Sequence, residues 1–143
     1  MLLCDVNVLV YAHRSDAPDH VAYRSWLENV INSQAAYGVS DVVLSGFLRV
    51  VTHPRIFNPP SRFEDALTFG EQIRNQPNAV LLRPGNRHWE IFTGLCTLAN
   101  VKGNLVPDAF LAALAIENGS EWITTDRDFS RFPNLVWRHP LDG

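Results

Sequence analysis

The chain has 143 residues, 46% of them hydrophobic, and its 12 basic and 15 acidic side chains give a net charge of −3. This length and apolar content predict one globular domain, residues 1–143, with a substantial core. The net negative charge argues against a broad basic surface for nucleic acid, and no apolar run reaches the roughly 18 residues of a membrane span.

Strand and helix signals alternate along the chain, without a linker or a repeated segment. We expect a strand over residues 2–6, a short helix over 8–13 and a longer helix that starts at 16–19 and ends near Ile31. A strand over residues 35–39 follows. The first part of the chain therefore predicts two strands joined by two helices.

In the middle of the chain, Ser40 is a natural N-cap for a helix over residues 41–52, which Pro54 stops. The clearest loop is residues 58–61, Asn-Pro-Pro-Ser, and a helix over residues 63–73 follows it.

The last part begins with a strand over residues 80–82 and a helix over 86–99 whose inward residues we expect to be Trp89, Phe92 and Leu95. A helix over residues 107–118, closed by Gly119, precedes strands over 122–124 and 135–137. Because helices separate the strands, the connections must be crossovers. The pattern predicts an α/β fold with a mainly parallel central sheet and helices on both faces.

Carboxylates follow two of the predicted strands. Asp5 interrupts the first apolar run, and Asp126, with Asp128 two residues later, follows the strand over 122–124. The carboxyl ends of strands are where open α/β sheets bind ligands. An ordinary Asx turn would also account for Asp126, whereas an acid in a buried parallel strand has few structural explanations.

A third carboxylate, Asp108, follows Pro107 in the first turn of a predicted helix. The helix dipole favours an acid there, and dipole compensation alone would account for it. Together with Asp5 and Asp126, however, it predicts a cluster that holds a hard divalent cation. Since no Ser, Cys or His has a nucleophile-and-base context and no glycine-rich phosphate loop is present, metal-assisted hydrolysis is the economical chemistry.

Four segments in order resemble the PIN-domain ribonucleases, and more narrowly the VapC toxins of type II toxin–antitoxin modules, in the subfamily abundant in mycobacteria. The resemblance covers essentially the whole chain, including the tail over residues 132–141. Its segments are Asp5-Val6-Asn7-Val8-Leu9, residues 49–57 (Arg-Val-Val-Thr-His-Pro-Arg-Ile-Phe), residues 108–115 (Asp-Ala-Phe-Leu-Ala-Ala-Leu-Ala) and Thr125-Asp126-Arg127-Asp128-Phe129.

The resemblance implies a three-layer α/β/α sandwich whose acidic pocket binds Mg²⁺, or Mn²⁺, and cleaves RNA. The family's first acid falls on Asp5, the third on Asp108 and the fourth on Asp126, with Asp128 as a supporting or alternative ligand. These residues are the predicted catalytic and metal-binding set. A divalent ion held by them would activate water near neutral pH and stabilise charge on the phosphate.

Three further residues are candidates for the substrate side of the site. Asn7 lies two positions after the first acid and can orient Asp5 or a water on the metal. Arg49 and Arg127 are candidate phosphate ligands, because arginine suits bidentate phosphate contacts. Arg49 could equally be a structural arginine paired with a buried acid.

The family's second acid falls on Gly46, where this chain departs from the pattern. Two or three carboxylates with water can still hold one Mg²⁺ ion. We expect Gly46→Glu to tighten divalent-ion binding, and to stabilise the helix by up to about 1 kcal/mol if the side chain fits.

The resemblance also implies a VapB-type antitoxin partner. The isolated residues Cys4 and Cys96 predict a reduced, cytoplasmic protein. Apolar helix faces exceed what one core needs and predict an antitoxin groove and a homodimer face; they carry Trp26, Phe63, Phe69, Trp89 and Phe92. A PIN domain that binds RNA or protein without cleavage is the alternative, because of Gly46. A haloacid-dehalogenase-type phosphatase needs an Asp where the chain has Asn7, and a receiver domain needs a lysine after a late strand, whereas Lys102 precedes a helix.

Overall fold

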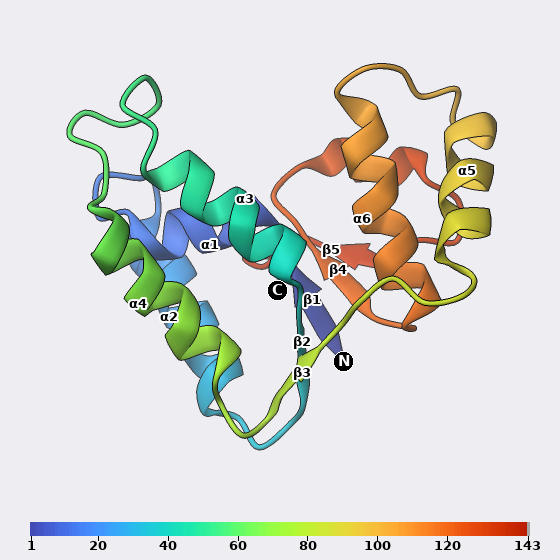
Figure 1. Cartoon of the computed structure of the whole chain (residues 1–143). Coiled ribbons are helices and arrows are strands. Elements are labelled where there is room, and N and C mark those ends of the chain that lie inside the picture. The colour runs from blue at the N-terminus through green and yellow to red at the C-terminus, as the bar shows by residue number, and fades with distance from the viewer. Residues whose placement is uncertain (143) are drawn as a thin grey trace.

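The computed structural model describes residues 1–142 as a five-stranded sheet with helices on both sides (Figure 1). The strands are β1 (Leu2–Cys4), β2 (Tyr37–Val39), β3 (Ala79–Leu81), β4 (Glu121–Ile123) and β5 (Trp137–Arg138). The helices are α1 (Val6–His13), α2 (His20–Asn32), α3 (Asp41–Val51), α4 (Phe63–Arg74), α5 (His88–Leu98) and α6 (Leu105–Glu117), with a 3-10 turn, η1 (Arg127–Arg131). Every predicted element is present, with ends that differ by a few residues, and only η1 was not predicted.

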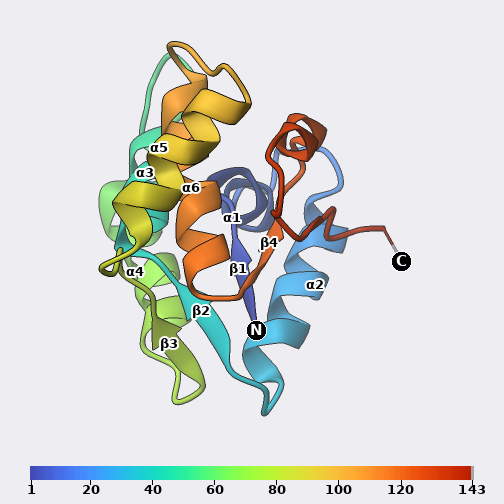
Figure 2. The same cartoon turned by 90° about the vertical axis from the view of Figure 1, so that its right-hand side faces the viewer.

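The sheet has the strand order β3-β2-β1-β4-β5, and all its strand pairs are parallel. Right-handed crossovers from β1 to β2 and from β2 to β3 put α1 to α4 on one face, and the return to β4 puts α5 and α6 on the other. Figures 1 and 2 show α2 and the α5–α6 pair on opposite sides of the central strands. The predicted α/β/α arrangement is confirmed.

The core is densest where α6 meets β4. Trp122 of β4 and residues 112–115 of α6 are fully buried. A helix that is apolar almost all round must be covered on more than one side, and α6 packs against both β4 and α5. This packing holds the first turn of α6, with Asp108, in a fixed position.

Two predicted helix ends are confirmed, and one helix start is corrected. The Ser40 Oγ caps α3 by accepting a hydrogen bond from Val43 N at 3.4 Å. Gly119 follows α6 with a φ of 62°, the left-handed conformation that ends many helices. The α6 helix starts at Leu105 rather than Pro107, which is possible because a proline in the first turn removes no helical hydrogen bond.

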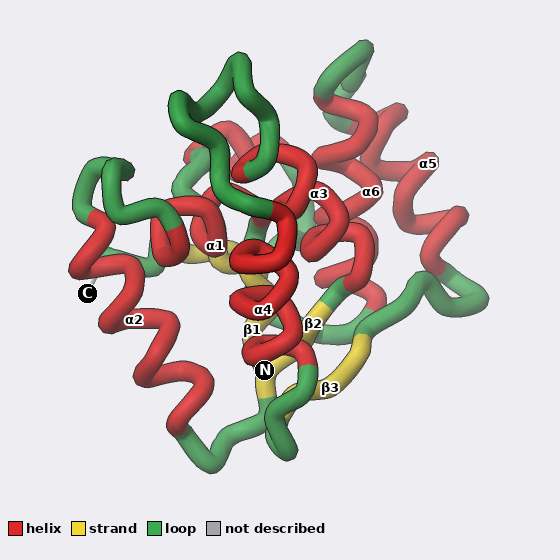
Figure 3. The backbone as a smooth tube through the Cα atoms, turned by 60° about the vertical axis from the view of Figure 1, so that its left-hand side comes forward, coloured by secondary structure: helices red, strands yellow, loops and turns green. Residues whose placement is uncertain are grey.

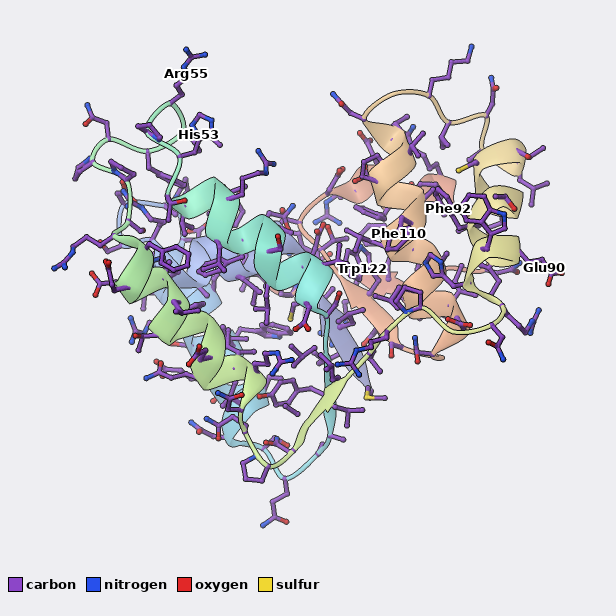
Figure 4. All side chains as sticks on the ribbon, viewed as in Figure 1. His53, Arg55, Glu90, Phe92, Phe110 and Trp122 are labelled. Atoms are coloured by element: carbon purple, nitrogen blue, oxygen red, sulfur yellow. The ribbon has the colours of Figure 1, made fainter. Side chains whose placement is uncertain are left out.

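The prediction that Trp89 faces inward is wrong, because 70% of its surface is exposed. The α5 helix packs mainly against α6, and only the face that carries Phe92 and Leu95 is covered. Figure 4 shows Phe92 pointing towards Phe110 of α6, and the two ring centroids lie 5.6 Å apart. Phe63 of α4 is also half exposed, so two of the aromatic residues are left for contacts outside this chain's core.

Residues 1–142 include no helix with the length and apolar character needed to cross a membrane. Both cysteines are free thiols. Burial next to Asp5 raises the pKa of Cys4 to about 12, so this side chain stays a neutral core thiol.

Candidate metal centre at the carboxyl edge of the sheet

The carboxyl ends of β1 and β4 meet where the strand order reverses. From β1 the chain crosses outward to β2 and β3, and then returns to the other side of β1 as β4. Open α/β sheets bind ligands at such a switch point, because the two crossovers diverge there. Asp5 directly follows β1 and Asp126 closely follows β4, so the fold brings these two predicted acids to the same place.

Asp5 is the N-cap of α1 and has only 7% of its surface exposed. Its Oδ1 accepts a hydrogen bond from Val6 N at 2.7 Å, and its Oδ2 accepts one from the Thr124 hydroxyl at 2.7 Å. Its backbone N–H donates to Ile123 O at 2.8 Å, which extends the pairing of β1 with β4. These contacts fix both the backbone and the carboxylate.

Thr124 connects Asp5 to the loop that carries Asp126. Its fully buried hydroxyl donates to Asp5 and accepts a hydrogen bond from Asp126 N at 3.0 Å. Thr124 was not among the predicted site residues. The register of Cys4 opposite Ile123 places Thr124 beside Asp5, and this register is a property of the folded sheet.

Asp108 lies half-buried in the first turn of α6. Burial raises the pKa of Asp108 above its ordinary value, and the negative charge of Asp126 raises it further. Burial likewise raises the pKa of Asp5 from 3.8 to about 6, against the lowering effect of its two hydrogen bonds and with a further rise from Asp108 and Asp126. The three carboxylates therefore lie within electrostatic reach of one another.

These carboxylates have no ion-pair partner in the described part of the chain. Among residues 1–142, Asp5, Asp108 and Asp126 form no ion pair. Three exposed acids, in contrast, are each held by an arginine: Asp16 by Arg14 at 2.7 Å, Asp41 by Arg74 at 2.8 Å and Asp142 by Arg127 at 3.1 Å. Buried carboxylates need a counter-charge more than exposed ones do. The group of Asp5, Asp108 and Asp126, which we call the carboxylate pocket, is therefore suited to an external cation.

Asp126 and Asp128 have different surroundings. Asp126 is half-buried and caps η1, because its Oδ1 accepts a hydrogen bond from Asp128 N at 2.9 Å. The Asp128 side chain is 76% exposed and lies 3.8 Å from Arg131. Asp126 is therefore the better placed of the two to act as the fourth acid.

In the described part of the chain, no three or more His, Cys, Asp or Glu side chains are placed closely enough to hold a metal ion as they stand. The assignment of Asp5, Asp108, Asp126 and Asp128 as metal ligands stays a prediction.

The family model of the PIN domain matches residues 2–135. The chain belongs to the PIN-domain family. Ribonuclease VapC43 of Mycobacterium tuberculosis is 48% identical over 143 residues, which are the whole of this chain and 97% of the relative. Ribonuclease VapC25 of the same organism is 40% identical over 135 residues, 94% of this chain and 95% of the relative.

Solved PIN-domain structures have the same fold at low sequence identity. VapBC2 from Rickettsia felis, bound to a DNA fragment from its promoter, aligns with a TM-score of 0.72 and 18% identity over 96% of this chain and 97% of that chain. The sarcin-ricin loop cleaving toxin VapC20 of Mycobacterium tuberculosis aligns with a TM-score of 0.66 and 14% identity over 95% of this chain and 99% of that chain.

The second acid position of the PIN domain, predicted at Gly46, lies against the start of α1. A Cβ atom at Gly46 would be 2.9 Å from Val6 Cγ2, closer than side chains normally approach. Gly46 therefore lies next to the residue that follows Asp5, and its assignment to the family's second acid position stays a prediction. The absent side chain at position 46 allows the close contact between α3 and α1.

The three predicted substrate residues differ in availability. Asn7 has a buried Oδ1 without a hydrogen-bond partner among the described residues. Arg49 is exposed one turn after Gly46, on the same side of α3, and forms no ion pair within residues 1–142. Arg127 donates two hydrogen bonds to Asp142, at 3.1 and 3.3 Å, so its guanidinium is already engaged.

Proposed function

We propose that this chain is a divalent-metal-dependent endoribonuclease that acts in the cytoplasm as the toxin of a type II toxin–antitoxin module. The observation that carries the proposal is the set of three carboxylates at the switch point, Asp5, Asp108 and Asp126, with raised pKa values for two of them and no cationic partner among residues 1–142. The names of the relatives, VapC ribonucleases at up to 48% identity, support the substrate class.

The donor atoms of the pocket are of the chemical kind that binds Mg²⁺ or Mn²⁺. All the candidate donors are oxygen atoms, which these hard cations prefer, and the buried Asn7 Oδ1 has an unused acceptor. Asp5, Asp108 and Asp126 would hold the ion, whose positive charge would offset their mutual repulsion. When bound, it would supply an activated water and stabilise the charge that develops on the phosphate.

The protein's own contribution is orientation and proton handling. Thr124 and Val6 N–H hold the two Asp5 oxygens, so this carboxylate cannot rotate away from the pocket. Thr124 also fixes the backbone of Asp126, which is less buried than Asp5 and can accept the proton of the attacking water. Asp108 brings the third charge from the opposite side, on a helix that is held by the core.

Chelator-sensitive RNA cleavage is the direct test. The purified chain should cleave RNA with Mg²⁺ or Mn²⁺, lose that activity in excess EDTA and regain it when the metal is restored. Cleavage that continues in EDTA would contradict metal dependence. RNA binding without cleavage under all metal conditions would favour the alternative, a binding-only PIN domain, for which Gly46 at the second acid position is the supporting observation.

We also propose a VapB-type antitoxin and a homodimer as partners. Several solved neighbours are toxin–antitoxin complexes, and two exposed aromatic side chains, Trp89 and Phe63, are available for such contacts. Expression of this chain alone should arrest growth, and expression of Asp5→Asn should not. If both are harmless, the toxin proposal fails.

A further inference from the structure

Two stretches of this acidic chain contain basic residues and no acid. No Asp or Glu occurs between Asp41 and Glu64, a stretch that carries three arginines and His53. No Asp or Glu occurs between Glu90 and Asp108, where Lys102 is the only basic residue. Both stretches therefore have a local positive charge although the whole chain has a net charge of −3.

The fold places these stretches on either side of the carboxylate pocket. The first contains most of α3 and the loop over residues 52–62, and the second contains the loop over residues 99–104 between α5 and α6. Figures 1, 2 and 3 show both loops rising from the same end of the molecule, away from the N-terminus, which lies at the opposite end of β1. This end carries the carboxyl ends of the parallel strands, and thus Asp5 and Asp126.

Three of the four Arg and Lys residues in these stretches differ from most other basic side chains of the protein, and the fourth, Arg62, is paired with Glu64. Arg49, Arg55 and Lys102 form no ion pair within residues 1–142. Seven other arginines are paired with acids: Arg14, Arg24, Arg62, Arg74, Arg127, Arg131 and Arg138. Arg83 and Arg87, between β3 and α5, also form no ion pair within residues 1–142. The unpaired positive charge of the two acid-free stretches is carried by Arg49, Arg55 and Lys102.

The loop over residues 52–62 is held in place by Arg14, which directly follows α1. The Arg14 guanidinium donates to Ser61 Oγ at 3.1 Å and to Pro59 O at 3.0 Å, and it lies 4.3 Å from the centre of the Phe57 ring. Its charge is balanced by Asp16, so it anchors the loop without adding to the free charge.

The tip of the same loop is ordered by His53. The His53 carbonyl accepts hydrogen bonds from Ile56 N and Phe57 N, and its Nδ1 accepts one from Arg55 N at 3.1 Å. Figure 4 shows the Arg55 side chain pointing outward from this tip. A charged side chain on a preformed loop loses little conformational entropy of the backbone when it binds a ligand.

We propose that single-stranded RNA crosses the carboxylate pocket with its phosphates held by Arg49 and Arg55 on one side and by Lys102 on the other. This inference rests on the proposed ribonuclease function and assigns the contacts that hold the substrate. Free cations flanking a metal-binding pocket match a chain with a negative charge on every nucleotide. Arg127, which Asp142 engages, takes no part in this binding.

The test is RNA binding by the full chain in the Asp5→Asn background, which prevents cleavage. A fluorescein-labelled single-stranded RNA of mixed sequence is titrated at several salt concentrations and followed by fluorescence anisotropy. Arg49→Ala/Arg55→Ala should weaken binding roughly tenfold at low salt and lower the slope of log K against log salt by about 1.4, and Lys102→Ala should lower it by about 0.7.

Arg24→Ala is the matched control, because Arg24 is exposed on α2 and paired with Glu28, and this change should alter neither affinity nor slope. Arg55→Lys should keep the wild-type slope, since it preserves the charge. Circular dichroism and thermal melting verify that every variant is folded.

The inference is overturned if the variant that combines Arg49→Ala, Arg55→Ala and Lys102→Ala binds RNA with the same affinity and slope as the control. It is also overturned if that variant keeps RNA binding but no longer binds its co-expressed antitoxin, because the two stretches would then serve a protein partner. In both cases wild-type cleavage of RNA would continue, and the proposed function would stand. If the wild-type chain neither binds nor cleaves RNA, both proposals fail.

Discussion

The helices α3 and α6 lie on opposite faces of the sheet and flank the same pocket, but they contribute to it very differently. The α6 helix is buried along most of its length and brings Asp108 in its first turn. The α3 helix brings Gly46, whose missing side chain lets it approach Val6 of α1. The negative charge of the pocket therefore comes from the sheet edge and α6, whereas α3 contributes close packing and a free arginine. If Gly46 is the family's second acid position, as the sequence predicts, this position has kept its place in the fold without its charge.

Replacement of the carboxylates of the pocket should have the largest effects on RNA cleavage. We expect Asp5→Asn and Asp108→Asn each to lower RNA cleavage by at least about two orders of magnitude, because each removes a charge that holds the metal. Asp128→Asn removes the same charge from an exposed side chain and should lower the rate of RNA cleavage only a few-fold. Rates are compared at equal Mn²⁺ with folding verified by circular dichroism. Undiminished cleavage in a folded Asp108→Asn would remove α6 from the mechanism.

The pH dependence of stability should report the burial of Asp5. Since the pKa of Asp5 is about 6 in the folded chain and 3.8 ordinarily, the folded state keeps a proton that the unfolded state has lost between these values. The free energy of unfolding of the metal-free chain should therefore decrease as pH rises from about 4 to 6, by up to about 3 kcal/mol from this residue.

Urea unfolding in EDTA at several pH values measures this decrease, and Asp5→Asn is the reference that lacks it. The subtraction is necessary because the lowered pKa of His13 acts in the opposite direction, since its burial favours the neutral ring. Equal pH profiles for the wild type and Asp5→Asn would show that Asp5 ionises in the folded chain as freely as in the unfolded one.

Stability and RNA cleavage should depend on the hydroxyl of Thr124 and not on its methyl group. Thr124→Val leaves Asp5 Oδ2 and Asp126 N without their partner, which should cost about 1–3 kcal/mol of stability and raise the pKa of Asp5 further. Cleavage should fall, and its pH profile should shift upward. Thr124→Ser restores both hydrogen bonds and should recover the profile. An unshifted profile in Thr124→Val would mean that the residue is only structural.

The sequence predicted the parts of this site that depend on local patterns. Asp5, Asp108 and Asp126 follow strand ends or begin a helix, and periodicity is enough to recognise such places. Thr124 was missed because its role depends on strand register, which is a long-range property. The engagement of Arg127 by Asp142 is equally invisible, since it requires the path of the C-terminal tail.

The inward placement of Trp89 failed for a related reason. Helical periodicity identifies the apolar face of α5, but not how much of that face its neighbours cover. The alternation of strands and helices predicts that the strands run parallel, but it does not predict their order in the sheet. The switch point between β1 and β4 had to be observed.

The smallest expected effect concerns α3, which has Gly46 beside the pocket in place of an acid. The structure alters the prediction for Gly46→Glu. Because a Cβ at this position would meet Val6 Cγ2 at 2.9 Å, the single variant should be destabilised by about 1–3 kcal/mol rather than stabilised.

Val6→Ala/Gly46→Glu removes the obstructing methyl groups while keeping the new carboxylate. We expect the double variant to bind Mn²⁺ a few-fold more tightly than Val6→Ala alone, as measured by calorimetric titration, because a carboxylate is added beside Asp5. Val6→Ala/Gly46→Gln has the same shape without the charge and should bind as Val6→Ala does. Equal affinities for the Glu and Gln variants would mean that α3 supplies only packing, and that the second acid of the family has no functional equivalent at this position.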